Sequence, residues 1–193
     1  MEIYGVILSA GKSARMGMPK ALVKIGGRTF LEIIFTNMKK AGVKNIYIVV
    51  GKDEQLIRKE TKLESLGFLI NPDFDAEQFS SMHLAMECLK EKSSAIMFAL
   101  VDHPLVKFET YKKLFDSAKE TEDKILIPSY NHRAGHPIVI PMSAYCFFLQ
   151  SDKQTAREVI QEHKELIKYI NVDNENILTN INTKEGWVIK KSA

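Results

Sequence analysis

The sequence predicts an α/β domain of three layers, in which a mainly parallel sheet carries helices on both faces. Short apolar runs alternate with stretches of helical spacing almost from end to end. Most of these runs are apolar throughout rather than alternately, as in parallel strands that are buried on both faces. The 193 residues contain no internal repeat, low-complexity tract or long linker, so a single domain over 1–193 is expected.

The first half of the chain predicts three strands and three helices. Residues 3–9 (IYGVILS) are too few for a helix and rich in β-formers, so they predict a buried strand. From Thr29 to Ala41 apolar residues recur at helical spacing, with Thr29 as a cap and Gly42 after the end. The same criteria predict strands over 45–51 and 67–72, and helices over 53–61 and from Ser80 or Ser81 to Lys90.

The second half continues the alternation. Its most apolar run, 95–102, is expected to be a strand and ends on a carboxylate, Asp102. Downstream the pattern predicts helices over 107–119, 142–149 and 154–163, strands over 124–128, 136–141 and 166–172, and a last helix from Thr183.

Composition excludes several classes of function. A net charge of +3, with basic residues scattered along the chain, argues against a nucleic-acid partner. No apolar stretch approaches the ~20 residues that span a bilayer, and the N-terminus lacks the features of a signal peptide. We therefore expect a cytoplasmic protein without a membrane partner. Cys88 and Cys146 lie in apolar company and are expected to be buried.

The loop after the first predicted strand, LSAGKSARMGMPKAL (8–22), concentrates glycine and positive charge. It fits neither the GxxxxGK[ST] loop nor the GxGxxG fingerprint. Gly11 and Gly17 still permit close approach to a ligand, while Arg15 and Lys20 suit phosphate oxygens. Composition alone leaves phosphate binding and an exposed, solvated loop equally open.

Asp102 stands where a carboxylate serves little packing purpose. Taken alone, it is best explained as a helix N-cap. Because Mg²⁺ is bound by one or two carboxylates together with substrate phosphates, the loop at 8–22 shifts the interpretation toward a metal ligand. The HxxxH spacing of His132 and His136 does not predict zinc, since no further ligand stands nearby.

The 8–22 loop resembles the signature of the nucleotidyltransferases that act on molybdopterin, LxAGxSxRMGxPKxL, at ten of its fifteen positions. The resemblance implies the Rossmann-like sheet of glycosyltransferase-A-type nucleotidyltransferases. It also implies that Arg15 and Lys20 contact the phosphates of a nucleoside triphosphate. The other nucleotide-binding positions that it implies in this loop are Leu8, Ser9, Ala10, Gly11, Ser13 and Gly17.

Further segments extend the resemblance. INPDFDAEQFSSMHLAM (70–86) is similar to the segment that reaches ribose and base, which implies nucleotide contacts for Asn71, Ser80 and Ser81. The serines can also cap the following helix, alone or together with that role. Gly-His-Pro at 135–137 and the stretch around Arg157 imply that His136 and Arg157 bind the acceptor. At the C-terminus, Asn180 and Asn182 replace family acids; Asn182 can still join Asp102 as a ligand of a weaker Mg²⁺ site.

The function that the resemblance implies is Mg²⁺-dependent transfer of CMP from CTP to the phosphate of molybdopterin, with release of pyrophosphate. Arg15, Lys20 and Asp102 would be catalytic, the N-terminal part would bind CTP and the C-terminal part the acceptor. A molybdoenzyme or its chaperone would be a further partner. Ala10, where guanylyltransferases carry glycine, favours CTP over GTP. GTP as donor, a sugar- or polyol-phosphate acceptor, and a catalytically weak nucleotide- or cofactor-binding protein remain as alternatives.

Overall fold

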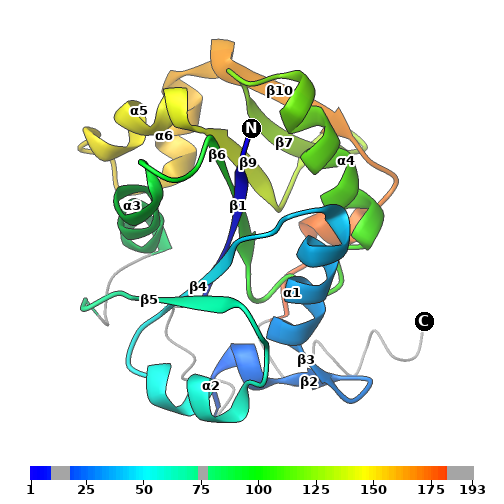
Figure 1. Ribbon diagram of the computed structural model, residues 1–193. Helices are drawn as coiled ribbons and strands as arrows, with labels where there is room; N and C mark the ends of the chain where they lie inside the picture. Colours follow the sequence, from blue (N-terminus) through cyan, green and yellow to red (C-terminus); the bar gives the residue numbers. More distant parts are fainter. Residues whose placement is uncertain (10–17, 74–77, 182–193) are drawn as a thin grey trace.

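The computed structural model describes residues 1–9, 18–73 and 78–181. These residues form one eight-stranded sheet with helices on both faces, so the predicted fold class is confirmed (Figure 1). The strand order is β10-β7-β9-β6-β1-β4-β5, and β8 pairs with β7. The strands are β1 (Ile3–Leu8), β4 (Ile46–Val50), β5 (Leu66–Ile70), β6 (Ala95–Leu100), β7 (Ile125–Tyr130), β8 (Arg133–Ala134), β9 (Ile138–Pro141) and β10 (Ile167–Asn171).

Strand direction defines one edge of the sheet. β1 is parallel to both β4 and β6, β4 is parallel to β5, and β7 is parallel to β10. β9 runs antiparallel to both of its neighbours, β6 and β7. The carboxyl ends of β1, β4, β5 and β6 therefore lie at the same edge as the amino end of β9.

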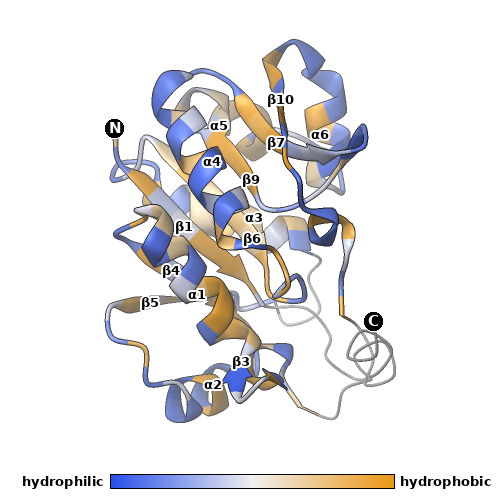
Figure 2. Ribbon diagram, turned by 90° about the vertical axis from the view of Figure 1, so that its right-hand side faces the viewer, coloured by the Kyte–Doolittle hydropathy of each residue, from blue (hydrophilic) through white to orange (hydrophobic). Residues whose placement is uncertain are grey.

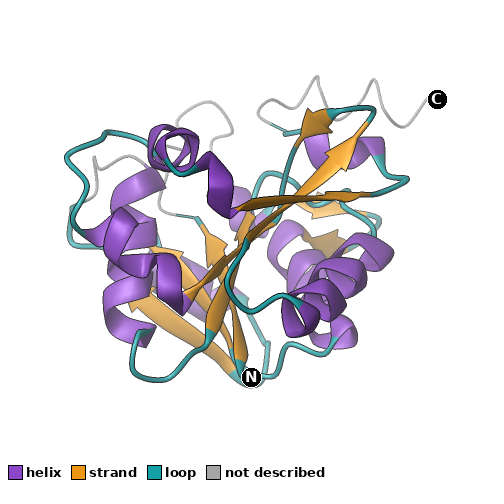
Figure 3. Cartoon of the chain, turned by 90° about the horizontal axis from the view of Figure 1, so that it is seen from above, coloured by secondary structure: helices purple, strands orange, loops and turns teal. Residues whose placement is uncertain are grey.

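Helices cover the two faces of the sheet as separate layers (Figure 3). α1 and α4 contact each other on one face, where Ile57 of α2 also joins the core. On the other face α5 contacts both α3 and α6. The helices are α1 (Phe30–Ala41), α2 (Glu54–Glu60), α3 (Gln78–Leu89), α4 (Phe108–Glu120), α5 (Tyr145–Leu149) and α6 (Ala156–Glu162), with short 3-10 turns η1 (Lys20–Leu22), η2 (Met142–Ala144), η3 (Lys164–Leu166) and η4 (Glu175–Leu178).

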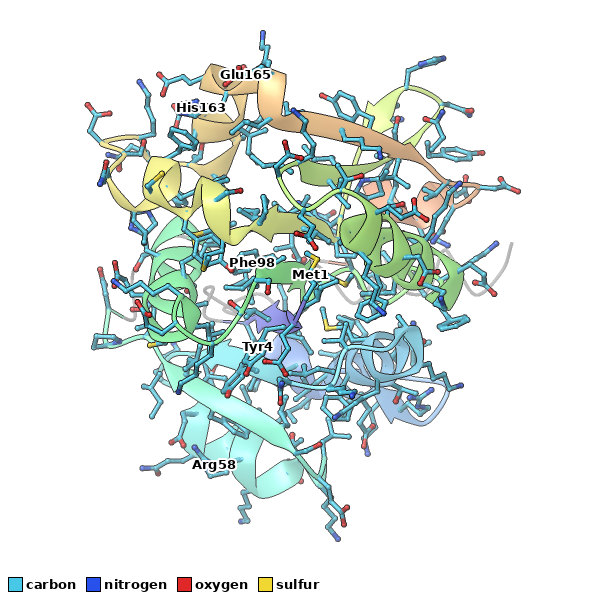
Figure 4. The ribbon with its side chains drawn as sticks, turned by 45° about the horizontal axis from the view of Figure 1, so that its top comes forward. Met1, Tyr4, Arg58, Phe98, His163 and Glu165 are labelled. Atoms are coloured by element: carbon cyan, nitrogen blue, oxygen red, sulfur yellow. The ribbon has the colours of Figure 1, made fainter. Side chains whose placement is uncertain are left out.

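Apolar strands hold the layers together, as the colouring of β1, β7 and β9 in Figure 2 shows. Ile3 and Ile7 of β1 point into the core beneath α1 and α4. Tyr4 of β1 and Phe98 of β6 belong to the opposite core, and both lie in the middle strands in Figure 4. Burial on both faces explains why these strands are apolar without alternation.

The ends of α1 follow the sequence closely. The Thr29 side chain accepts a hydrogen bond from the Glu32 amide, and the Glu32 side chain accepts one from the Thr29 amide. This capping box fixes the first turn. Gly42 ends the helix at φ 111°, a left-handed conformation that favours glycine.

One expectation was wrong, one hairpin was missed, and one predicted helix is not tested. Cys88 and Cys146 are both exposed, because the helices that carry them turn other residues toward the core. A small hairpin, β2 (Lys24–Ile25) and β3 (Arg28–Thr29), was not predicted, although the Gly26-Gly27 turn was a signal for it. The helix predicted from Thr183 lies outside the described residues. Among the residues that are described, no helix is long and apolar enough to cross a membrane.

Gly42→Ala should destabilise the protein more than Gly27→Ala. Both positions have φ above zero, so each alanine costs about 1–2 kcal/mol of backbone strain. A Cβ at Gly42 would also lie 2.7 Å from the Phe115 ring, whereas one at Gly27 would meet nothing within 4 Å. The clash adds about 1–3 kcal/mol. Urea unfolding measures both variants, and equal losses would contradict the packing at Phe115.

Candidate functional site

Two of the three residues predicted to be catalytic meet at the carboxyl edge of the sheet. Lys20 begins η1 after Pro19, and Asp102 follows the end of β6. Lys20 Nζ donates a hydrogen bond to Asp102 Oδ2 at 3.0 Å, although the residues are 82 positions apart. Both side chains are only partly buried, so a ligand can reach them. Arg15, the third residue, lies outside the described part of the chain.

The end of β1 lies beside the chain that leads from β6 to Asp102. Leu8 is buried at the end of β1, and its carbonyl accepts a hydrogen bond from the Val101 amide at 3.1 Å. The Ser9 amide donates to the Val49 carbonyl. Leu8 and Ser9 therefore lie next to the strand, β6, that Asp102 follows. The 8–22 loop's other predicted nucleotide-binding residues lie outside the described residues: Ala10, Gly11, Ser13, Arg15 and Gly17.

The C-terminal segment also reaches Asp102. The Ile181 amide donates a hydrogen bond to the Asp102 backbone carbonyl at 2.8 Å. Asn180 is exposed, and Asn182, the second predicted metal ligand, follows Ile181 outside the described residues.

His103 connects Asp102 to His136. Its Nε2 lies 3.9 Å from Asp102 Oδ1, and its ring packs edge-on against the His136 ring, with centroids 5.3 Å apart. Burial lowers the pKa of His103, although the Asp102 carboxylate opposes the shift. Burial, together with His103, lowers the pKa of His136 to about 4. Burial therefore favours the uncharged form of both rings. Sequence reasoning missed His103, whose only signal was its position directly after Asp102.

The backbone before β9 is held against η4. The His136 amide donates to the Ile177 carbonyl at 3.0 Å, and the Gly135 amide donates to the Pro128 carbonyl at 2.9 Å. A Cβ at Gly135 would lie 2.3 Å from the Ile177 carbonyl oxygen. Only glycine fits this close approach, which explains the residue that precedes His136.

A pocket of about 840 Å³ brings His136 and Arg157 together. It lies between α3, α6 and the strands β7, β9 and β10, and Arg157 is exposed at its wall. The two residues predicted to bind the acceptor therefore share one cavity. Its apolar lining includes Phe79, Met82, Ile127, Ile138, Ile160 and Ile167, and its polar lining includes Gln78, Gln154, Thr155, Gln161, Lys164 and Tyr169.

Asn71, Ser80 and Ser81 also lie close together, and their side chains hydrogen-bond to one another. The Asn71 side-chain amide donates to both serine hydroxyls at 3.1 Å and accepts from the Asp73 amide. Asn71 is 3% and Ser81 1% exposed. Because α3 begins at Gln78, the serines lie inside the helix, and the expectation that one of them caps its start was wrong. The cluster ties the segment after β5 to α3.

A magnesium ion fits the donors at Asp102, whereas a metal cage made of protein alone does not. Within residues 1–9, 18–73 and 78–181, no group of three or more His, Cys, Asp or Glu could hold a metal ion. A single hard carboxylate beside a lysine is the arrangement expected when most ligands are phosphate oxygens and water, as is usual for Mg²⁺.

Asn71→Ala should lower the free energy of unfolding by about 2 kcal/mol, because it removes three hydrogen bonds from a buried position. Asn37→Ala, which removes one hydrogen bond to the Val106 carbonyl, is a matched control with a smaller loss. Urea unfolding compares them. A smaller effect at Asn71 than at Asn37 would contradict the structural role of the cluster.

Comparison with known proteins agrees with the fold. Residues 5–166 match the MobA-like NTP transferase domain family. GlmU from Clostridium botulinum (strain Kyoto / Type A2), a bifunctional protein, is 32% identical over 116 residues, which are 58% of this chain and 24% of GlmU. The match thus spans about a quarter of that relative. Nicotine blue oxidoreductase from Paenarthrobacter nicotinovorans is 32% identical over 146 residues, covering 72% of this chain and 70% of the relative.

Solved structures share the same architecture. Rv0371c from Mycobacterium tuberculosis H37Rv superposes with a TM-score of 0.84 at 19% identity and covers 100% of both chains. The molybdopterin-guanine dinucleotide biosynthesis protein A of Archaeoglobus fulgidus gives a TM-score of 0.72 at 18% identity, over 98% of this chain and 97% of its own. At sequence identities of 18–19%, the structural similarity shows a shared fold alone. Since the family match covers most of the sequence, the chain belongs to the MobA-like NTP transferase domain family, within the nucleotidyltransferase superfamily.

Proposed function

We propose that this protein transfers CMP from CTP to the terminal phosphate of molybdopterin in a Mg²⁺-dependent reaction that releases pyrophosphate. The observation that carries the proposal is the Lys20–Asp102 pair, which His103 and His136 connect to the wall of a pocket that Arg157 also lines. This arrangement offers a place for triphosphate and metal next to a place for the acceptor.

The reaction exchanges one phosphoanhydride bond for another. An oxygen of the acceptor phosphate attacks the α-phosphorus of CTP and forms a new P–O bond. The bond between the α-phosphorus and the oxygen bridging to the β-phosphate breaks, and pyrophosphate leaves with the electron pair. Nothing is oxidised or reduced, and no covalent intermediate with the protein forms. Catalysis then consists of positioning and charge stabilisation.

The basic residues and the oxygen ligands have different tasks in this reaction. Arg15 and Lys20 hold oxygens of the departing pyrophosphate. Asp102 and Asn182 hold Mg²⁺, which when bound offsets negative charge on the phosphates. With asparagine in place of acids at 180 and 182, this site is less negative than the family pattern implies, so weak metal binding is expected. The same substitutions favour the second candidate, a nucleotide-binding protein that transfers CMP poorly.

The pocket favours a ring system over a sugar as acceptor. Its isoleucines, together with Phe79 and Met82, form apolar surface against which polyol hydroxyls would lose their hydrogen bonds to water. The flat ring of a pterin loses less there, and the nearby glutamines can bond its polar edge. Arg157 suits an anionic group. The name of the Archaeoglobus fulgidus neighbour points to molybdopterin as well.

CTP should bind more tightly than GTP, ATP or UTP, and only in the presence of Mg²⁺. Ala10 is expected to narrow the space beside the base, so Ala10→Gly should reduce the preference for CTP over GTP. Isothermal titration with each nucleotide, with and without Mg²⁺, measures this preference. Tighter binding of another nucleotide would retain the family but contradict CTP as donor, and a folded protein that binds none would contradict nucleotide transfer altogether.

Lys20→Met should change metal binding in opposite directions with and without nucleotide. Without CTP the Lys20 ammonium competes with the metal for Asp102, so its removal should tighten Mn²⁺ binding about two- to fivefold, the size of one partly exposed ion pair. With CTP, Lys20 holds phosphate, so its removal should weaken Mn²⁺–CTP binding. Electron paramagnetic resonance measures the concentration of free Mn²⁺ and therefore how much of it is bound. Lys24→Met, an exposed lysine in β2, is the matched control.

Asp102→Asn completes the comparison. It keeps the shape of the side chain but removes the charge, so Mn²⁺ binding should fall in both settings. Pyrophosphate release should fall about 100- to 1000-fold, the effect of losing one group that stabilises transition-state charge. An Asp102→Asn protein with unchanged turnover would overturn Asp102 as a metal ligand.

A further inference from the structure

We infer that His103 is a positioning residue for the acceptor: its ring holds the ring of His136 in place at the wall of the pocket. The inference rests on the proposed function, because it takes the pocket of His136 and Arg157 to be where the acceptor binds. It adds a residue that acts through His136 and that the sequence did not single out.

The two rings come from segments whose backbones are fixed independently. The His103 amide donates to the Leu100 carbonyl at 3.1 Å in the turn after β6. The His136 amide donates to the Ile177 carbonyl at 3.0 Å just before β9. β6 and β9 are neighbours in the sheet (Figure 1), and Phe98 is paired with Ile138. The pairing brings the two side chains together, with an angle of 65° between the rings.

Hydrogen bonding through Nδ1 does not set the orientation of either ring. The Nδ1 atoms of His103 and His136 are both buried and lack a hydrogen-bond partner among the described residues. An imidazole is usually oriented by the hydrogen bonds of its nitrogens. Here that constraint is missing at Nδ1 of each ring. The Ile177 backbone acts on the His103 ring, and the edge-to-face contact between the rings in turn opposes rotation of His136.

His103 also separates the two halves of the site. It is 8% exposed and fills the space between Asp102 and His136. The 3.9 Å from its Nε2 to Asp102 Oδ1 is too long for a hydrogen bond, so Lys20 remains the closer partner of the carboxylate. Loss of the His103 ring would therefore let His136 move while Lys20 and Asp102 stay in place. An acceptor displaced by about 1 Å reacts far more slowly in an in-line attack.

Two variants separate the ring from its nitrogens. His103→Ala removes the contact and should raise the KM for molybdopterin about five- to tenfold, which corresponds to the interaction energy of one aromatic pair. The Kd for CTP with Mg²⁺ should stay within about twofold of the wild-type value. His103→Phe keeps a ring edge against His136 and should restore the KM to within about threefold of the wild-type value. His163→Ala, which removes a ring contact with Phe147 in another part of the fold, is the matched control (Figure 4).

Folding and ring position are followed separately. His103→Phe replaces a buried polar group that lacks a partner at Nδ1, so its melting temperature should not fall below that of the wild type. In two-bond ¹H–¹⁵N spectra, the His136 ring signals, assigned by their loss in His136→Gln, should shift in His103→Ala and much less in His163→Ala.

The inference is overturned if His103→Ala keeps the wild-type KM for molybdopterin, or if it weakens CTP binding as much as acceptor binding. It is equally overturned if His103→Phe is as impaired as His103→Ala, because the nitrogens rather than the ring contact would then matter. If the wild type transfers no CMP, the proposed function fails. The ring spectra still test the contact in that case, and an unshifted His136 in His103→Ala would refute it.

Discussion

β9 runs antiparallel to both of its neighbours, whereas β10, β7, β6, β1, β4 and β5 all run in one direction, and the candidate site depends on this reversal. The amino end of β9 lies at the edge where β1 and β6 end, so His136 comes close to His103 and Asp102. A β9 parallel to β6 would carry His136 to the opposite edge, away from Lys20. The close approach of Gly135 to the Ile177 carbonyl then fixes the position of the backbone just before β9. One strand direction thus joins the two halves of the site.

The contacts within the site differ in what they contribute. A partly exposed ion pair such as Lys20–Asp102 adds about 0–1 kcal/mol to stability, so its value to the protein lies in the charges that it places at the edge of the sheet. The Asn71 cluster is buried and satisfied, and it holds α3 against the segment after β5. The histidine pair is buried but has an unpartnered Nδ1 in each ring, a cost that a purely structural contact would not require. The described contacts therefore differ in kind: a partly exposed ion pair, a buried hydrogen-bonded cluster and a buried ring contact.

Much of the fold followed from local chemistry. The apolar strands and the capped α1 were predicted because burial and capping leave clear patterns over a few residues. The pairing of Lys20 with Asp102 was foreseeable, since both follow predicted strands in a sheet whose carboxyl ends share an edge. The direction of β9, and therefore the contact of His103 with His136, depends on long-range pairing that no local pattern encodes. Exposure of Cys88 and Cys146 likewise depends on how each helix is rotated against the sheet.

The central claim is that the charged edge and the neighbouring pocket together transfer the nucleotidyl group of CTP. Incubation of the protein with Mg²⁺, molybdopterin and CTP labelled at either the α- or the γ-phosphate tests it most directly. We expect the α-label in the pterin product and the γ-label in pyrophosphate, in equal amounts. Retention of both labels in CTP, or transfer of the γ-label to the pterin, would contradict this account.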